Sequence, residues 1–138
     1  MTIELSLCNV NWLSVIVATL LAFAVGGLWY SPVLFGKIWA KETGMTRNEE
    51  NKPNTLLIFG TTFVLEFTST LLMDMVLGKE ACLVSGLKLG AIISLGWVST
   101  SFGTSYLFSQ KSFKLFLIDA GHFVVWFILA AAILGVWK

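Results

Sequence analysis

The sequence predicts an all-α protein: a four-helix transmembrane bundle with a short amphipathic interfacial helix in its first loop. Two observations predict this fold class. Of the 138 residues, 57% are hydrophobic and only 12% are charged, whereas a soluble domain is about 25% charged. The chain also contains four long apolar runs, each close to or above the roughly 20 residues that a helix needs to cross hydrocarbon. We therefore treat residues 1–138 as a single integral membrane domain.

The four apolar runs cover residues 12–30, 55–77, 82–108 and 113–137. Each is expected to be a helix, because backbone polar groups inside a bilayer must be satisfied within the segment. In the first loop, Ser31 and Pro32 are typical of a helix start. Apolar residues mixed with Lys37 and Lys41 follow, up to a stop at Gly44. We expect the interfacial helix over about residues 32–43.

The distribution of basic residues predicts the orientation. The loops after the first and third runs together hold six Lys and Arg residues, and the opposite side holds three. Because basic loops stay in the cytoplasm, we expect the six-residue side to be cytoplasmic and both termini to be extracytoplasmic. The net charge of +1 gives no basic patch for a nucleic-acid partner. The expected partners are the lipid bilayer and, since so small a chain has little interior, a homo-oligomer or larger membrane complex.

Small residues recur at a spacing of four in two of the runs. Such spacing lets helix backbones approach closely in membranes. The first run carries Ala18, Ala22 and Gly26 on one line, and the third run carries another line. That second line consists of Gly86, Gly90 and Ser94. We interpret both lines as contacts within the bundle or between copies of it.

Three ionisable residues fall well inside the predicted spans, away from their ends: Glu66 in the second, and Asp119 and His122, the only histidine, in the fourth. Such groups are costly at bilayer depth unless they face protein or water, so they are functional candidates. At 1.5 Å per residue, Glu66 lies about 16 Å along its helix and His122 about 14 Å. We expect one polar cluster between the second and fourth helices, in which Glu66 either pairs with His122 or stays largely protonated. Asp74 is expected near the outer edge.

Other polar and aromatic residues could line a path beside this cluster. The candidates are Ser94, Trp97, Ser101 and Trp126. Hydroxyls in membrane helices also serve as packing contacts, so both interpretations stay open. Trp97 and Trp126 fall near mid-depth, where a buried indole N–H needs a partner.

Several functions are compatible with these residues. The first is a non-enzymatic oligomer or complex subunit, in which the polar cluster fixes how the helices pack. The alternatives are a small proton-coupled transporter or ion pathway, and a membrane-embedded enzyme acting on a lipid or quinone. We assign no catalytic residue, no cofactor and no metal site, since one histidine in an Asp-x-x-His spacing is a weak metal signal. Cys8 and Cys82 should both lie near the outer surface, either as free thiols or as a disulfide.

Three segments resemble a family of small bacterial membrane proteins catalogued as domain of unknown function 1761. They are residues 26–32 (GGLWYSP), 96–101 (GWVSTS) and 114–121 (KLFLIDAG). The resemblance implies a four-helix protein of the cell inner membrane without an established activity. The family often has asparagine and tyrosine where this chain has Asp119 and His122, so proton transfer by these two residues would not be a family-wide function.

The first of these segments forms a junction at the end of the first helix. Its residues are Gly26, Gly27, Trp29, Tyr30, Ser31 and Pro32. The glycines permit close approach, the aromatic side chains anchor the interface, and Ser31 and Pro32 turn the chain. The alternative is a binding mouth formed by Trp29, Tyr30 and the start of the next helix.

Overall fold

The computed structural model describes residues 5–44 and 54–138, and within these ranges the regular structure is entirely helical. The elements are η1 (Leu7–Asn9), α1 (Trp12–Trp29), α2 (Gly36–Thr43), α3 (Thr55–Leu77), α4 (Leu83–Ala91), η3 (Ile92–Val98), α5 (Ser99–Phe108) and α6 (Phe113–Val136). The helices α4, η3 and α5 form one continuous span, Leu83–Phe108. Together with α1, α3 and α6 it makes four helices long and apolar enough to cross a membrane. The predicted all-α, four-helix fold is confirmed.

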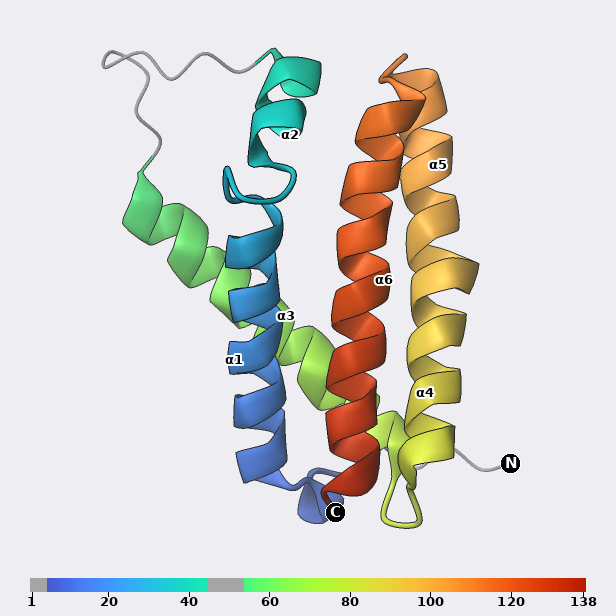
Figure 1. Cartoon of the computed structure of the whole chain (residues 1–138). Coiled ribbons are helices and arrows are strands. Elements are labelled where there is room, and N and C mark those ends of the chain that lie inside the picture. Colours follow the sequence, from blue (N-terminus) through green and yellow to red (C-terminus); the bar gives the residue numbers. More distant parts are fainter. Residues whose placement is uncertain (1–4, 45–53) are drawn as a thin grey trace.

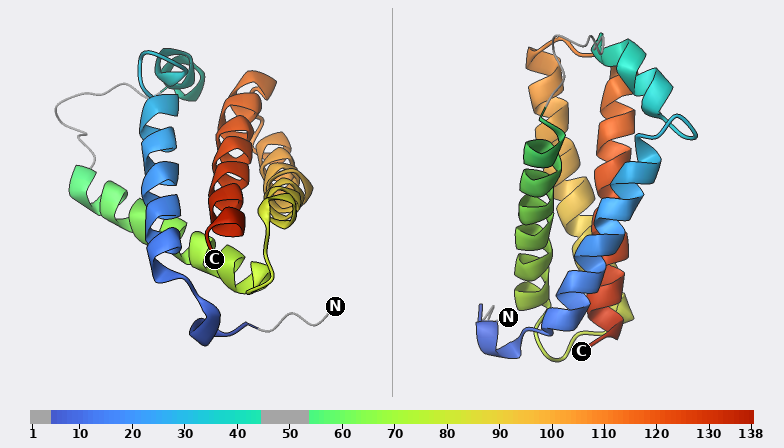
Figure 2. Two further views of the ribbon diagram at one scale, coloured as in Figure 1. Left: turned by 60° about the horizontal axis from the view of Figure 1, so that its bottom comes forward. Right: turned by 90° about the vertical axis from the view of Figure 1, so that its left-hand side faces the viewer.

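Three of the spans stand nearly upright beside one another, and the fourth is strongly tilted (Figure 1). Helix α6 lies between α1 and the α4–α5 span. Helix α3 begins far from α5 and approaches α4 only toward its own end (Figures 1 and 2). Helix α2 and the α5–α6 turn lie at one end of the bundle, and Lys138 lies at the other. The tilt of α3 therefore opens the bundle at the α2 end and closes it at the opposite end.

Glycine allows α4 and α6 to touch through their backbones. A Cβ at Gly86 would lie 2.2 Å from the Ala131 carbonyl oxygen, and one at Gly135 would lie 2.4 Å from the Cys82 carbonyl oxygen. A Cβ at Gly90 would lie 2.8 Å from the helix α6 backbone. We call this contact of Gly86, Gly90 and Gly135 the glycine seam. It confirms that the predicted small-residue line of the third span is a packing surface.

The small residues of α1 also face the interior. Ala18 and Ala22 are fully or almost fully buried, and they join a core with Phe127 and Leu134 on α6. A Cβ at Gly26 would lie 3.1 Å from Nε2 of His122. The predicted small-residue line of the first span is therefore also a contact within the bundle.

The connection between α1 and α2 differs from the prediction. The Ser31 hydroxyl donates to the Leu28 carbonyl at 2.6 Å, so it closes α1 instead of capping α2. A turn follows, in which the Gly36 N–H donates to the Ser31 carbonyl at 2.9 Å. A Cβ at Gly36 would lie 2.3 Å from the Tyr30 carbonyl oxygen, so this turn requires glycine. Helix α2 thus begins at Gly36 instead of residue 32, and it ends as predicted before Gly44, whose φ is 67°.

The third span contains a wide turn that the sequence pattern did not predict. Residues Ile92–Val98 form a π-helix, and the Ser99 N–H donates to the carbonyl of Ser94, five residues earlier. The Ser99 hydroxyl donates to the same carbonyl at 2.7 Å. Insertions of this kind inside α-helices often mark functional sites. Here the wide turn follows Gly86 and Gly90 and lies at the middle of the span.

Candidate functional site

One face of α3 and one face of α6 carry the buried carboxyl and imidazole side chains of the described bundle. Glu66, Thr70 and Asp74 occupy successive turns of α3 and are 7%, 0% and 1% exposed. Asp119 and His122 lie one turn apart on α6 and are 8% and 7% exposed. Both helices run from the α2 end to the opposite end (Figure 1). The sequence-predicted residues are therefore interior, as expected for ionisable groups in a membrane span.

Asp119 receives two tyrosine hydroxyls. Tyr30, which follows α1, donates to Oδ1 at 2.7 Å, and Tyr106 on α5 donates to Oδ2. Both carboxylate oxygens are thus hydrogen-bonded, and three spans meet at one side chain. The prediction placed Asp119 in a cluster with Glu66 and His122 and did not identify these partners.

His122 sits among aromatic rings. Its ring centroid lies 5.1 Å from that of Tyr30 and 5.0 Å from that of Phe123. The indoles of Trp29 and Trp126 lie at 6.3 and 6.4 Å, and Trp126 is stacked on it at an interplanar angle of 19°. These rings hold the imidazole without offering it a hydrogen-bond partner.

Four buried side-chain polar atoms in the described part of the chain have no hydrogen-bond partner. They are Oε2 of Glu66, Nδ1 and Nε2 of His122, and Nε1 of Trp126. Glu66 and His122 therefore do not bond to each other, and a largely protonated Glu66 stays a prediction. We call Glu66, His122 and Trp126 the polar interior. Leaving a buried polar group unpaired costs about 1–3 kcal/mol, so this region is costly to fold.

The other predicted lining residues are divided between inside and outside. Ser94 is buried, and its hydroxyl donates to the Gly90 carbonyl at 2.7 Å. Trp126 is 3% exposed, whereas Trp97 is 65% exposed and Ser101 is also exposed. The structure thus brings Trp126 to His122 and leaves Trp97 and Ser101 on the outer surface. Within residues 5–44 and 54–138, His, Cys, Asp and Glu form no group of three that could hold a metal ion.

The predicted junction packs directly against α6. The Trp29 indole N–H donates to the Ile118 carbonyl at 3.0 Å, and a Cβ at Gly121 would lie 3.2 Å from the indole. Tyr30 reaches Asp119, and Gly26 faces His122. Gly27 has open space around it. The segments at residues 26–32 and 114–121 are therefore two sides of one contact.

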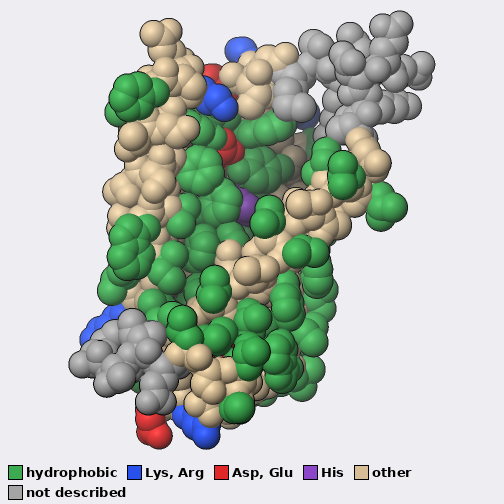
Figure 3. Space-filling view, turned by 180° about the vertical axis from the view of Figure 1, so that it is seen from behind, with side chains coloured by type: hydrophobic (Ala, Val, Ile, Leu, Met, Phe, Trp, Pro, Cys, Tyr) green, Lys and Arg blue, Asp and Glu red, His purple; other side chains and the backbone are tan. Residues whose placement is uncertain are grey.

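A hollow opens on the face of the molecule opposite to that of Figure 1. Figure 3 shows apolar side chains around it and the single histidine within it. This agrees with the 7% exposure of His122. The hollow follows from the tilt of α3, whose first half stands away from α5 (Figures 1 and 2).

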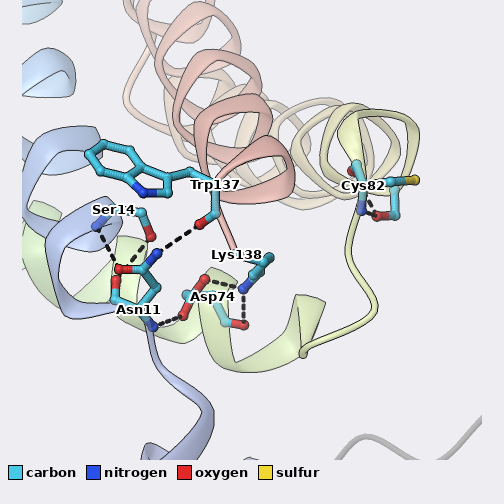
Figure 4. Close-up of polar contacts among 7 residues, drawn as sticks. Asn11, Ser14, Asp74, Cys82, Trp137 and Lys138 are labelled. Atoms are coloured by element: carbon cyan, nitrogen blue, oxygen red, sulfur yellow. Dashed lines mark hydrogen bonds and ion pairs between the residues drawn. The ribbon is translucent and has the colours of Figure 1, made fainter.

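The end of the bundle opposite α2 holds a second polar group that the sequence pattern did not reveal. Asp74 forms an ion pair with Lys138 and accepts the Asn11 N–H at 3.2 Å. The Asn11 side chain donates to the Trp137 carbonyl at 3.1 Å (Figure 4). These contacts join the end of α3 to both ends of the described chain. Asp74 lies at this end as predicted, but it is buried and paired.

The two cysteines are free and exposed. The predicted alternative of a disulfide between Cys8 and Cys82 is therefore not formed in this structure.

The described residues thus form a helical bundle with an ionisable interior, and its four spans have the length and composition of a multi-pass membrane protein. The chain belongs to the family described as Protein of unknown function (DUF1761), whose model matches residues 13–135. No curated protein and no solved structure matches the chain.

Proposed function

We propose that this protein transfers protons across a membrane along the buried polar faces of α3 and α6. The observation that carries the proposal is the set of partnerless polar atoms on Glu66, His122 and Trp126. A polar network that only fixed helix packing would gain its stability from satisfied hydrogen bonds. Here the buried polar atoms of Glu66, His122 and Trp126 have no hydrogen-bond partner. They therefore reduce the stability of the bundle and do not fix how its helices pack. Proton transfer is a use for such groups.

The polar groups extend from one end of the bundle to the other. Asp119 lies about 9 Å along α6 and His122 about 14 Å, and Glu66 lies about 16 Å along the tilted α3, which starts from the same end. Thr70 and Asp74 follow Glu66 at steps of about 6 Å. Each step is longer than a hydrogen bond, so the path requires water between the groups. A spread over the whole span favours a path over a single binding site.

We also propose that the α2 end faces the cytoplasm of a cell inner membrane. Four exposed lysines lie at the α2 end, in α2 and at the α5–α6 turn: Lys37, Lys41, Lys111 and Lys114. Protons would then enter or leave the cytoplasm at Asp119, between Tyr30 and Tyr106.

Proton flux into proteoliposomes tests the proposal. The protein is reconstituted with an entrapped pH-sensitive dye, and a potassium gradient with valinomycin supplies the driving voltage. We expect the wild type to acidify the lumen and Glu66→Gln to lose most of that flux, because an amide cannot carry the proton. Glu80→Gln, at an exposed position in the α3–α4 turn, is the matched control and should conduct normally. A wild type without flux, or an unaffected Glu66→Gln, would reject the proposal.

A second candidate function is that of a non-enzymatic oligomer or complex subunit. Small and hydroxylated residues form an outward stripe on η3 and α5: Gly96, Thr100 and Thr104 are all exposed. A Cβ at Gly96 would meet nothing within 4 Å, so Gly96 packs against no other helix of the described residues. Stripes of this kind support helix association in membranes. Thr100→Leu should reduce cross-linked dimer in native membranes if the stripe is an interface, and an unchanged yield would count against it.

A further inference from the structure

A groove of about 350 Å³ lies between α2 and the first part of α6. Its walls include Trp29, Phe35, Ile38, Lys114, Leu117 and Gly121. None of these residues carries the proposed proton path, so the groove is a separate feature.

The inner wall of the groove is a fixed apolar surface. The Trp29 indole lies 4.7 Å from the Phe35 ring, measured between centroids. Its N–H is already bonded to the Ile118 carbonyl, so it presents carbon atoms to the groove. Gly121 allows the indole to lie against α6, since a Cβ there would approach within 3.2 Å. A wall built in this way suits a hydrocarbon chain.

The α6 side of the groove changes from charged to apolar along its length. Lys114 is in the first turn of α6 and is exposed. Leu117 and Gly121 follow at three and seven residues, on the same helix face. Gly121 is therefore about 10 Å deeper into the bundle than Lys114. The order, a cation at the end and apolar groups toward the middle, matches the orientation of a lipid in a bilayer.

Helix α2, on the other side of the groove, is linked to the start of α6 and carries basic residues. The Ser112 hydroxyl, just before α6, donates to the Glu42 carboxylate at 2.6 Å and so links α2 to the start of α6. Lys37 and Lys41 are exposed on α2. Glu42 is the only acidic residue of the described α2, and Ser112 already occupies one of its oxygens. Lys114 is the charged residue in the lining of the groove, and its ammonium is complementary to an anion.

We propose that this groove binds an anionic phospholipid, with the phosphate at Lys114 and an acyl chain against Trp29, Phe35 and Leu117. The apolar wall explains why the occupant is a lipid and not a soluble phosphate. Lys114 explains why the head group is anionic. The bound lipid would hold α2 against α6 at the cytoplasmic end.

Native mass spectrometry of the purified full chain tests the site. The protein is mixed with phosphatidylglycerol or phosphatidylcholine of the same acyl chains, and the lipid-bound fraction is titrated. Wild type should bind phosphatidylglycerol more tightly, and Lys114→Gln should weaken that binding about fivefold, the effect of one interfacial lysine. Leu117→Trp, at an exposed position, should fill the groove and reduce binding of both lipids. Lys79→Gln, exposed in the α3–α4 turn at the other end, is the control and should bind like wild type.

Three results would overturn the proposal. One is equal affinity of the wild type for the two lipids. Another is a Lys114→Gln protein that binds phosphatidylglycerol as tightly as the Lys79→Gln control. The third is binding of glycerol phosphate to the wild type as tightly as phosphatidylglycerol in the same titration. That result would make the site one for soluble phosphate. Since no residue of the proton path is changed, these outcomes are independent of the proton-flux experiment.

Discussion

The glycine seam and the polar interior are two regions of one bundle built by opposite means. In the seam, Gly86, Gly90 and Gly135 let two backbones touch, and the neighbouring Ser94 hydroxyl bonds within its own helix. In the polar interior, large side chains stand beside a hollow, and four buried polar atoms lack partners. The comparison indicates that the seam supplies stability, whereas the polar interior reduces stability and is kept for chemistry.

The largest effect is expected at the seam. Gly86→Ala places a Cβ 2.2 Å from a backbone oxygen of α6, and a backbone cannot move aside cheaply. We expect a loss of about 3 kcal/mol in the free energy of unfolding, the upper range for overpacking. Gly60→Ala is the matched control, since a Cβ there meets nothing within 4 Å and alanine favours helix. Denaturation in mixed micelles measures the free energy of unfolding of both variants. Equal values would show that the glycine seam does not stabilise the bundle.

A smaller loss of stability is expected at Asp119, because both of its carboxylate oxygens accept hydrogen bonds. Tyr30→Phe and Tyr106→Phe each remove one hydroxyl from Asp119, at a cost of about 1.5 kcal/mol for a bond to a charged group. The double variant should lose more than the two single losses together, because the buried carboxylate then has no donor. The same unfolding assay completes this double-mutant cycle. Strict additivity would show that the two tyrosines do not share Asp119.

Glu66→Leu should change stability little. Its Oε2 has no partner to lose, so removing it relieves a desolvation cost, and the net change should stay within about 1 kcal/mol. Gel filtration and unfolding measure the outcome, with Glu66→Gln as the isosteric control. If Glu66→Leu fails to assemble, the carboxyl group fixes helix packing. The polar interior would then stabilise the bundle, as the glycine seam does.

The smallest effect concerns a thiol at the end of the seam. Hydrogen bonds from the Ser85 backbone N–H and side chain, and from the Val84 backbone, lower the pKa of Cys82. A lower pKa means that the thiolate persists to lower pH. In a Cys8→Ser chain, alkylation by iodoacetamide should therefore have a lower pH midpoint than that of a model cysteine peptide. Ser85→Ala should raise the midpoint, and an identical midpoint in peptide and protein would show that the start of α4 does not form this cap.

The parts of the fold that depend on local sequence were predictable. Four apolar runs gave four spans, and small residues at a spacing of four gave the two packing lines. Gly44 ended α2 because its φ of 67° suits glycine. Each of these features is decided within a few residues, so no knowledge of distant contacts is needed.

The parts that depend on how spans face one another were not predictable. The helices are apolar on all sides, so their pattern does not show which face is interior. Trp97 was therefore a candidate for the lining although it is exposed. The partners of Asp119 come from two other spans: Tyr30 is 89 residues away in sequence, and Tyr106 belongs to α5. The tilt of α3, which creates the hollow beside His122, likewise leaves no local signal.

The most direct test of the central claim asks whether water reaches the polar interior and not the packed core. In a chain with Cys8→Ser and Cys82→Ser, single cysteines are placed by His122→Cys and, as the matched large-to-small control, by Leu134→Cys, whose position is 0% exposed. A small cationic methanethiosulfonate in water then probes both thiols in proteoliposomes. The account predicts labelling at position 122 and none at position 134. Equal labelling at the two positions, or no labelling at 122, would contradict it.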